Sequence, residues 1–178
     1  MYLVPGDIVL IRGRHILGSL IRFFSRTIGE SLTKINHVGI IITEGDEYTA
    51  GFIEALTTVK KHFLSIYKDT PNDIAIARAK NLSLEEKQKI ADIASTYIGK
   101  RYGYFKMVTH LLDWALMGVY LFRRLTPLDK FPICSWVVAH AFESVNKTFG
   151  VNPGAATPDD IWDFIMKNPE KYELIREL

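Results

Sequence analysis

Strand-like hydrophobic patterns are concentrated in the first 80 residues of this chain, and helix signals dominate afterwards. Runs that are rich in β-branched residues or alternate apolar positions predict strands over residues 7–11, 37–43, 48–55 and 73–79. Strands that come first and helices that follow are typical of α+β folds. We therefore expect an α+β fold with an antiparallel sheet, drawn from the N-terminal half, that packs against helices.

Helix boundaries are marked by capping residues. Ser83 and Glu86 have the spacing of a capping box, and Gly99 is a suitable helix end. Thr157 and Pro158 combine an N-cap with a proline at the first helical position. These signals and the hydrophobic periodicity predict helices over residues 16–28, 83–99, 105–124, 134–150 and 157–166, and a closing strand over 172–176.

The composition suits one compact domain that covers residues 1–178. The chain is 48% hydrophobic and 24% charged, and it contains no internal repeat and no linker-like tract. The net charge of +2 lacks the basic excess that binding a phosphate backbone requires, so we expect no nucleic-acid partner. The sequence gives no indication of the oligomeric state.

Three features bear on compartment and covalent chemistry. The first residues contain no basic stretch followed by an apolar run, so we expect no secretory signal and a cytoplasmic protein by default. The most apolar segment, residues 111–122, contains Asp113 and is shorter than the ~20 residues that cross a bilayer. With Cys134 as its one cysteine, the chain has no internal disulfide and no Cys-rich zinc site.

The hairpin expected between residues 37–43 and 48–55 relates His37 to Glu54. If residues 45 and 46 form a two-residue turn, the register places His37 directly opposite Glu54. Opposed side chains share one face, with Cβ atoms about 4.5 to 5.5 Å apart. The Glu54 carboxylate then accepts from one imidazole nitrogen and directs the other outward, as in the orienting half of a catalytic triad.

The same two residues also fit an ordinary, partly solvated cross-strand pair. A slip of one residue in the register sends the two side chains to opposite faces, and Asn36 or Asp46 then becomes the candidate third residue. The register of this hairpin is therefore the feature that tests the hypothesis.

Cys134 lies at the expected start of a helix whose apolar positions turn its side chain toward the protein body. Free amide donors and the positive dipole end at a helix start stabilise a thiolate, and the same donors can hold an oxyanion. A buried cysteine that takes no part in chemistry fits the same position.

The other histidines offer no metal site. His140 lies six positions after Cys134, off the helix face that carries the cysteine, which favours a solvated role. His15, His62 and His110 have no second histidine at a metal-ligand spacing, and the chain contains no HExxH. Since there is also no glycine-rich phosphate loop, we expect neither a metal nor a cofactor.

Residues 105–124 are apolar over more of the helix circumference than a surface helix needs. Burial in the core explains this breadth, and a lid or lipid-facing wall from Met107 to Phe122 is the functional alternative. The second interpretation includes peripheral contact with a membrane surface.

Several short motifs give the chain a resemblance to a known enzyme family. They are Pro5-Gly6-Asp7-Ile8-Val9-Leu10, His37-Val-Gly-Ile-Ile41, Phe52-Ile-Glu-Ala55, Cys134-Ser-Trp-Val-Val138 and Thr157-Pro158-Asp159. The sequence resembles the circularly permuted branch of the NlpC-type papain-like cysteine peptidases, which includes YiiX-like proteins and relatives of lecithin retinol acyltransferase. In this branch the histidine strand precedes the cysteine, which is the order found here.

The resemblance implies a permuted papain-like fold and a role for each of the three residues. Cys134 matches the nucleophile, His37 the base and Glu54 the orienting third residue. Residues 99–103 look like the Gly-x-x-Tyr-Asp segment of the family, but Gly103 stands where an Asp is often found. Acyltransferase relatives often use a histidine as the third member, so Glu54 favours the peptidase-like side.

The expected function is a cysteine hydrolase that cleaves an amide bond in a peptidoglycan stem peptide or another small peptide. One alternative is a thioesterase, phospholipase or acyltransferase that acts on lipid acyl chains with the same triad. Another is a non-catalytic binding domain of the same fold. The separation between the Cys134 sulfur and the His37 ring distinguishes the two enzymes from the binding domain.

Overall fold

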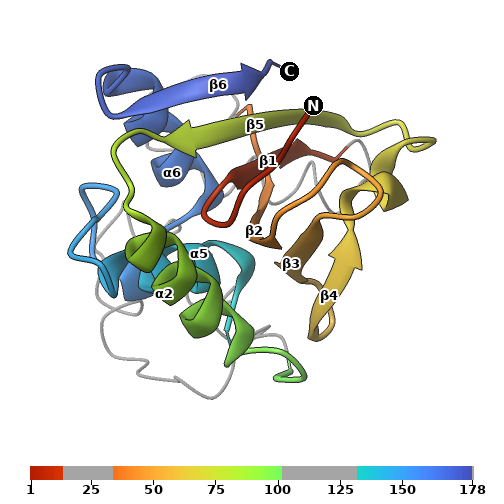
Figure 1. Ribbon diagram of the computed structural model, residues 1–178, viewed down its shortest axis with the longest axis horizontal. Coiled ribbons are helices and arrows are strands. Elements are labelled where there is room, and N and C mark those ends of the chain that lie inside the picture. Colours follow the sequence, from red (N-terminus) through yellow and green to blue (C-terminus); the bar gives the residue numbers. More distant parts are fainter. Residues whose placement is uncertain (14–33, 102–131, 178) are drawn as a thin grey trace, which may run out of the picture.

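The computed structural model describes residues 1–13, 34–101 and 132–177, which form one sheet with helices beside it (Figure 1). The strands are β1 (Ile8–Arg12), β2 (His37–Thr43), β3 (Gly51–Ala55), β4 (Val59–Phe63), β5 (Asp73–Ala79) and β6 (Tyr172–Arg176). The helices are α2 (Leu84–Ser95), α5 (Cys134–Glu143) and α6 (Pro158–Lys167), with short 3-10 helices η1 (Leu64–Tyr67) and η2 (Pro153–Ala155).

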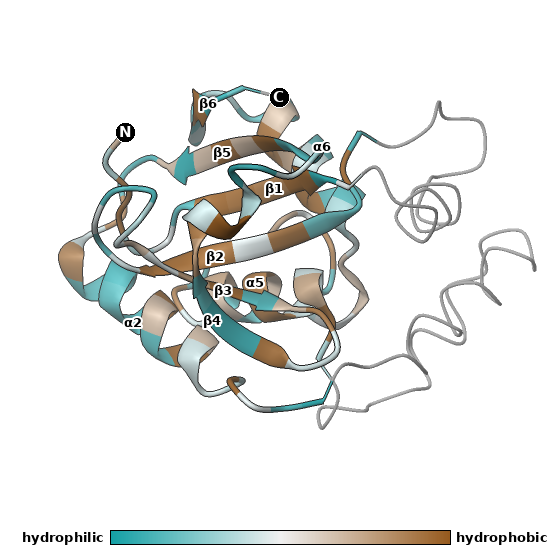
Figure 2. Cartoon of the chain, turned by 90° about the vertical axis from the view of Figure 1, so that its right-hand side faces the viewer, coloured by the Kyte–Doolittle hydropathy of each residue, from teal (hydrophilic) through white to brown (hydrophobic). Residues whose placement is uncertain are grey.

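The six strands follow the order β4-β3-β2-β1-β5-β6, and every neighbouring pair is antiparallel. Strand β2, inside the sheet, is predominantly hydrophobic, whereas the edge strand β4 is largely hydrophilic (Figure 2). The predicted α+β class is confirmed. The expected closing strand is also present, so the sheet draws β6 from the C-terminal end of the chain.

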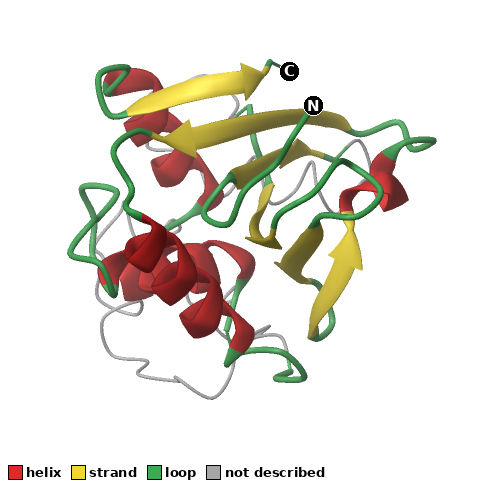
Figure 3. Ribbon diagram, in the orientation of Figure 1, coloured by secondary structure: helices red, strands yellow, loops and turns green. Residues whose placement is uncertain are grey.

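The sheet separates two hydrophobic cores because successive side chains of a strand point to opposite faces. Ile8 and Ile40 belong to the core that includes residues of α2, α5 and α6. Val9 and Ile41 belong to the second core, with Phe52 of β3. The α-helices α2, α5 and α6 gather on one side of the strands (Figure 3), and both α2 and α5 contact β2. The start of α5 is thereby held against the strand that carries His37.

The helix starts follow the predicted caps. Ser83 and Glu86 form a capping box at the start of α2, and Thr157 and Asp160 form another at the start of α6. Helix α5 ends at Glu143, earlier than expected, and Asn146 adopts a left-handed conformation just beyond it. This conformation is typical of helix ends.

The two-residue hairpin turn expected at residues 45 and 46 is wrong. Thr43 pairs with Gly51, and the register shifts between Ile41 and Thr43. The Asp46 carboxylate accepts hydrogen bonds from the amides of residues 48 and 49 at 2.9 and 3.0 Å, and so stabilises a longer loop. Gly45 instead pairs with Leu3 near the N-terminus. Strand β3 therefore begins later than the sequence pattern predicted.

The Pro5-Gly6-Asp7 segment is a turn that leads into β1. Gly6 has a φ of +91°, a conformation that favours glycine. The Asp7 side chain is buried, and its two oxygens accept bonds from the Arg78 guanidinium at 2.8 and 2.7 Å. This ion pair ties the start of β1 to β5, next to the strand that carries His37.

Two expected helices, over residues 16–28 and 105–124, lie outside the described residues. The same holds for Gly103 and for the apolar wall expected from Met107 to Phe122. Among the helices that the structure describes, none has the length and hydropathy needed to cross a membrane.

Candidate active site

His37 and Glu54 lie on the same face of the sheet, but they are not directly opposite each other. Glu54 pairs with Gly39, and His37 is two residues away along β2. The expected direct opposition is therefore wrong by two positions, because a longer loop and a bulge replace the tight turn. A shift of two keeps the side chains on one face. The His37 ring reaches Glu54 diagonally, with 2.7 Å between Nε2 and Oε2.

The Glu54 carboxylate is fully buried, and its Oε2 atom is the centre of a small network. Besides His37, it accepts a hydrogen bond of 2.5 Å from the hydroxyl of Tyr67, the last residue of η1. Burial opposes ionisation of Glu54, but the hydrogen bond and charge of His37, followed by Tyr67, lower the pKa of the carboxyl below its usual value. Glu54 is therefore a carboxylate at neutral pH.

Cys134 is the first residue of α5, where the backbone amides have no helical partner. Its side chain is buried, and the groups that act on the sulfur are the His37 ring and the backbone amides of Val38 and Ser135. Burial disfavours the thiolate, but the charge of His37, followed by the two amides, lowers the pKa of the Cys134 thiol below its usual value.

The His37 ring therefore bridges the sulfur and the carboxylate. Glu54 occupies Nε2, which leaves Nδ1 for Cys134. Burial disfavours the imidazolium, but the Cys134 thiolate, and then Glu54, raise the pKa of His37 above its usual value. The contact between Cys134 and His37 does not fit the non-catalytic alternative, which assumed that the two side chains are too far apart to react.

Ser135 and Trp136 fix the start of α5 and so position the thiol. The Ser135 hydroxyl is buried and donates to the carbonyl of Ala156, at 2.6 Å. The Trp136 ring packs edge-on against Tyr97, with 5.0 Å between the ring centroids. The Cys-Ser-Trp motif thus places a buried thiol and two anchoring side chains in the first turn of the helix.

Gly39 leaves room for an aromatic ring beside Glu54. A Cβ atom on Gly39 would lie 2.2 Å from the Phe52 ring and 2.6 Å from the carbonyl oxygen of Ile53. No side chain fits at this position of β2 without displacing β3, which carries Glu54.

Tyr67 and His62 are part of the site, although the sequence analysis did not assign them to it. His62 Nε2 lies 3.9 Å from Glu54 Oε1. In the sequence, His62 has no second histidine at a metal-ligand spacing, and no other pattern links it to Glu54. Strand β4 was not predicted because Lys60 and Lys61 interrupt its hydrophobic alternation. No sequence signal pointed to Tyr67, since η1 brings it to Glu54 only in the folded chain.

The fallback residues Asn36 and Asp46 have other partners. The Asn36 side chain exchanges two hydrogen bonds with the backbone of Gly13, at 2.8 and 3.0 Å. Asp46 caps its own loop. His140, six residues along α5 from Cys134, is partly exposed and faces Glu143. Within residues 1–13, 34–101 and 132–177, no three His, Cys, Asp or Glu side chains are grouped to hold a metal ion.

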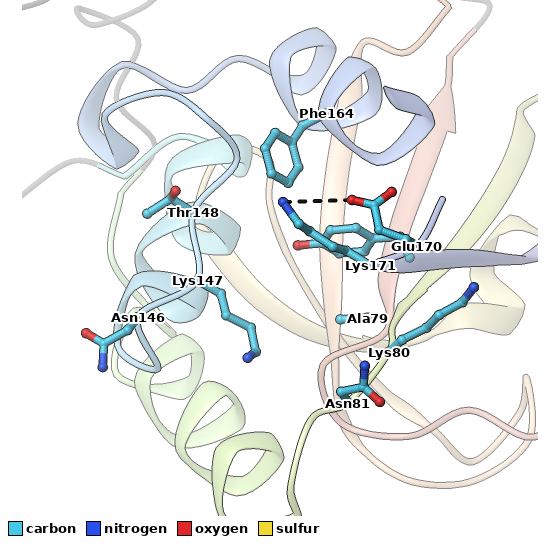
Figure 4. Close-up of a pocket in the computed structure, with 10 residues that line it drawn as sticks. Ala79, Lys80, Asn81, Asn146, Lys147, Thr148, Phe164, Glu170 and Lys171 are labelled. Atoms are coloured by element: carbon cyan, nitrogen blue, oxygen red, sulfur yellow. Dashed lines mark ion pairs between the residues drawn. The ribbon is translucent and has the colours of Figure 1, made fainter. Parts of the chain in front are cut away.

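A separate pocket of about 520 Å³ lies near the end of α6 (Figure 4). Its lining residues are Ala79, Lys80, Asn81, Asn146, Lys147, Thr148, Phe164, Glu170, Lys171 and Tyr172. The cations already have partners: Lys147 pairs with Glu86, Lys171 pairs with Glu170, and Lys80 donates to a backbone carbonyl. Neither the thiol nor its histidine contributes to this pocket.

The fold is similar to that of a solved bacterial protein. The crystal structure of metalloprotein YiiX from Escherichia coli O157:H7 aligns with a TM-score of 0.57 at 19% sequence identity. The alignment covers 98% of this chain and 88% of that chain. No curated protein matches this sequence.

The sequence itself matches a family profile over residues 2–110. The family is described as permuted papain-like amidase enzymes, YaeF/YiiX, C92 family. The matched span is more than half of the chain and contains His37 and Glu54, while Cys134 lies beyond it. The chain therefore belongs to the C92 family of permuted papain-like amidases.

Proposed function

We propose that this chain is a cysteine amidase in which Cys134 is the nucleophile, His37 transfers the proton and Glu54 orients His37. One observation carries the proposal: the His37 ring interacts with the Cys134 sulfur and, through Nε2, makes a hydrogen bond of 2.7 Å to the buried carboxylate of Glu54. A nucleophile, a base and an orienting group in this order are the arrangement that acyl transfer needs.

The first half of the reaction forms an acyl-enzyme. The Cys134 thiolate attacks the carbonyl carbon of the substrate amide, and the carbonyl oxygen takes the negative charge. Protonated His37 then donates its proton to the leaving nitrogen, the carbon–nitrogen bond breaks and the amine departs. The product that remains is a thioester on Cys134.

The second half releases the acid. His37, now neutral, takes a proton from water, and the resulting hydroxide attacks the thioester carbon. When the tetrahedral intermediate collapses, the carbon–sulfur bond breaks and the thiolate is restored beside the imidazolium. Glu54 stabilises the positive charge of His37 in both halves because its carboxylate is ionised and in contact with Nε2.

Backbone amides at the start of α5 supply the stabilisation of the oxyanion. The N-cap residue Ile133 makes no side-chain hydrogen bond to these amides, so those that do not act on the sulfur can donate to a substrate oxygen. The helix dipole adds a favourable potential at the same place. We expect the substrate carbonyl to sit over the first turn of α5, next to the sulfur.

The substrate class that we propose is a small peptide, with the stem peptide of peptidoglycan as one example. The family assignment supports amide chemistry. Purified protein incubated with soluble muropeptides and with short fluorogenic peptides should release an amine, detected by mass spectrometry. Cys134→Ala should abolish this release. In the wild type, an intermediate trapped during turnover should add the mass of the acyl group to Cys134.

A series of p-nitrophenyl esters with increasing chain length tests the lipid alternative. If kcat/KM rises steeply with acyl length and no peptide is cleaved, the peptide proposal is wrong and an acyl-chain enzyme takes its place. If neither amides nor esters acylate Cys134, the proposal of an amidase is itself contradicted.

A further inference from the structure

Strand β4 brings His62 to the second oxygen of Glu54. The His62 Nε2 atom lies 3.9 Å from Glu54 Oε1, and both atoms are buried. Neither atom has a hydrogen-bond partner within the part of the chain that the structure describes. The two groups thus face each other, although the separation exceeds a normal hydrogen bond.

His37 and His62 lie on β2 and β4, the two strands that flank Glu54, and each is two residues from the position paired with Glu54. Glu54 pairs with Gly39 on β2 and with Lys60 on β4. His37 is two residues from Gly39, and His62 is two residues from Lys60. Both rings therefore reach the same face of the sheet on a diagonal. The two rings approach Glu54 from opposite ends of β3. His62 pairs with Phe52, near the start of β3, whereas His37 lies beyond the Gly39–Glu54 pair, at the other end of that strand.

The two oxygens of Glu54 differ in their surroundings. Oε2 contacts both the His37 ring and the Tyr67 hydroxyl, whereas Oε1 faces only the His62 ring among the contacts that the structure describes. A buried carboxylate is costly unless opposite charges or donors compensate it. His62 is the group placed to compensate Oε1.

We propose that His62 is a positioning residue of the triad, which keeps Glu54 ionised from the side of Oε1 and so keeps Oε2 directed at His37. This inference rests on the proposed function, because it concerns how the Cys134–His37 pair is held. His62 acts through Glu54, whose Oε1 atom it faces.

The charged and titratable groups around Glu54 are consistent with a role for His62 in keeping the Glu54 carboxylate ionised. His37 of β2 and Tyr67 of η1 hold Oε2, and Lys60, which pairs with Glu54 on β4, is exposed. Burial opposes ionisation of Glu54, while His37, Tyr67 and His62 lower the pKa of its carboxyl. Loss of His62 should therefore raise the pKa of Glu54, weaken the imidazolium of His37 and raise the pKa of the Cys134 thiol.

The test follows the rate of Cys134 alkylation by iodoacetamide from pH 4 to 9, because this rate reports the thiolate without any substrate. His62→Phe should move the acid limb of the profile to higher pH by roughly half a unit or more. His62→Gln, whose amide can donate to Oε1, should recover part of the shift. His62→Leu replaces the phenylalanine variant if thermal unfolding shows that the latter does not fold.

His140→Phe is the matched control. The His140 side chain is 27% exposed and faces the carboxylate of Glu143, while that of His62 is 28% exposed and faces Glu54. The His140 ring also packs on Trp136, with 4.2 Å between the ring centroids, and phenylalanine keeps an aromatic ring at that position. The control variant should leave the alkylation profile of Cys134 unchanged. An equal shift in both variants would show a general effect of losing a histidine and would overturn the inference.

A double variant tests whether His62 acts through Glu54. In a Glu54→Gln background, His62→Phe should cause little further shift, because the charge that His62 supports is already absent. An additive shift overturns the inference, as does an unmoved acid limb in folded His62→Phe or His62→Leu.

The same profiles keep this inference separate from the proposed function. If wild-type Cys134 alkylates like a free cysteine over the whole range, the catalytic thiolate is absent and the proposed function fails. If the wild type shows a low acid limb that His62 variants do not move, only the role of His62 fails.

Discussion

Gly39, and not His37, lies opposite Glu54 across β2 and β3, and His37 meets the carboxylate from a diagonal position. Gly39, the residue directly across from Glu54 on β2, has no side chain, and the Phe52 ring occupies the space that a Cβ of Gly39 would need. The His37 imidazole is thus placed at the first residue of β2, where it also reaches Cys134 at the start of α5.

Glu54→Gln should lower kcat by roughly 10²- to 10⁴-fold, since the neutral amide no longer stabilises the imidazolium of His37. The loss should be smaller than that caused by Cys134→Ala, and the double variant should be little worse than Cys134→Ala alone. Glu143→Gln, which alters the carboxylate that faces His140, should keep wild-type activity. Independent, additive losses for Glu54 and Cys134 would contradict a triad.

The thiol and the imidazole should form an ion pair over a wide pH range. The lowered pKa of Cys134 means that the thiolate persists as the pH falls below the usual cysteine range. The raised pKa of His37 means that the imidazolium persists as the pH rises above the usual histidine range. At pH 6, Cys134 should therefore alkylate faster than the thiol of a model peptide. His37→Ala should remove this advantage, and equal rates in protein and peptide from pH 6 to 8 would argue against the ion pair.

Gly39→Ala should destabilise the fold by about 1–3 kcal/mol or more, because the added methyl group overlaps the Phe52 ring. Chemical denaturation of the variant measures this loss. Adding Phe52→Leu should recover part of the stability by removing the overlapping ring atoms. A Gly39→Ala protein as stable as the wild type would show that β3 moves away without cost.

Asp7→Ala should lower the free energy of unfolding by about 2 kcal/mol or more, since the buried carboxylate accepts two bonds from Arg78 and one from the Val4 amide. Removing an exposed ion pair offers a contrast. Asp163 pairs with Lys167 at 2.6 Å on the surface of α6, and Asp163→Ala should change stability by less than about 0.5 kcal/mol. Similar losses in both variants would show that burial does not set the strength of the Asp7 pair.

Local chemistry was sufficient to predict several elements. The capping boxes that begin at Ser83 and Thr157 depend on side chains that bond within one helical turn, so their spacing in the sequence is their spacing in space. The β-branched run of β2 and the alternation of β5 likewise reflect burial of individual strands. These features need no knowledge of the rest of the chain.

The register of the β2–β3 hairpin could not be predicted because it depends on contacts outside the hairpin. Gly45 bonds to Leu3, and Asp46 stabilises a loop that is longer than the tight turn assumed from the sequence. The candidate pair kept a common face only because the shift was an even number of residues.

The edge strand β4 was missed for a related reason. One face of an edge strand is open to water, so Lys60 and Lys61 dilute the pattern that marks a buried strand. Without β4, no argument from the sequence brings His62 to Glu54, and no argument brings Tyr67 to the same carboxylate through η1. The surroundings of Glu54 were thus visible only in the assembled sheet.

The first turn of α5 and the strand β2 are far apart in the sequence, which has a consequence for the protein as it folds. A fragment limited to β1, β2 and β3 holds an imidazole and a carboxylate with no sulfur to activate. A detached α5 holds a thiol without the charge of His37, so it has the reactivity of any free cysteine. Incomplete or unfolded chains therefore lack the activated thiol, and the appearance of a fast-reacting thiol during refolding should coincide with the docking of α5 on the sheet.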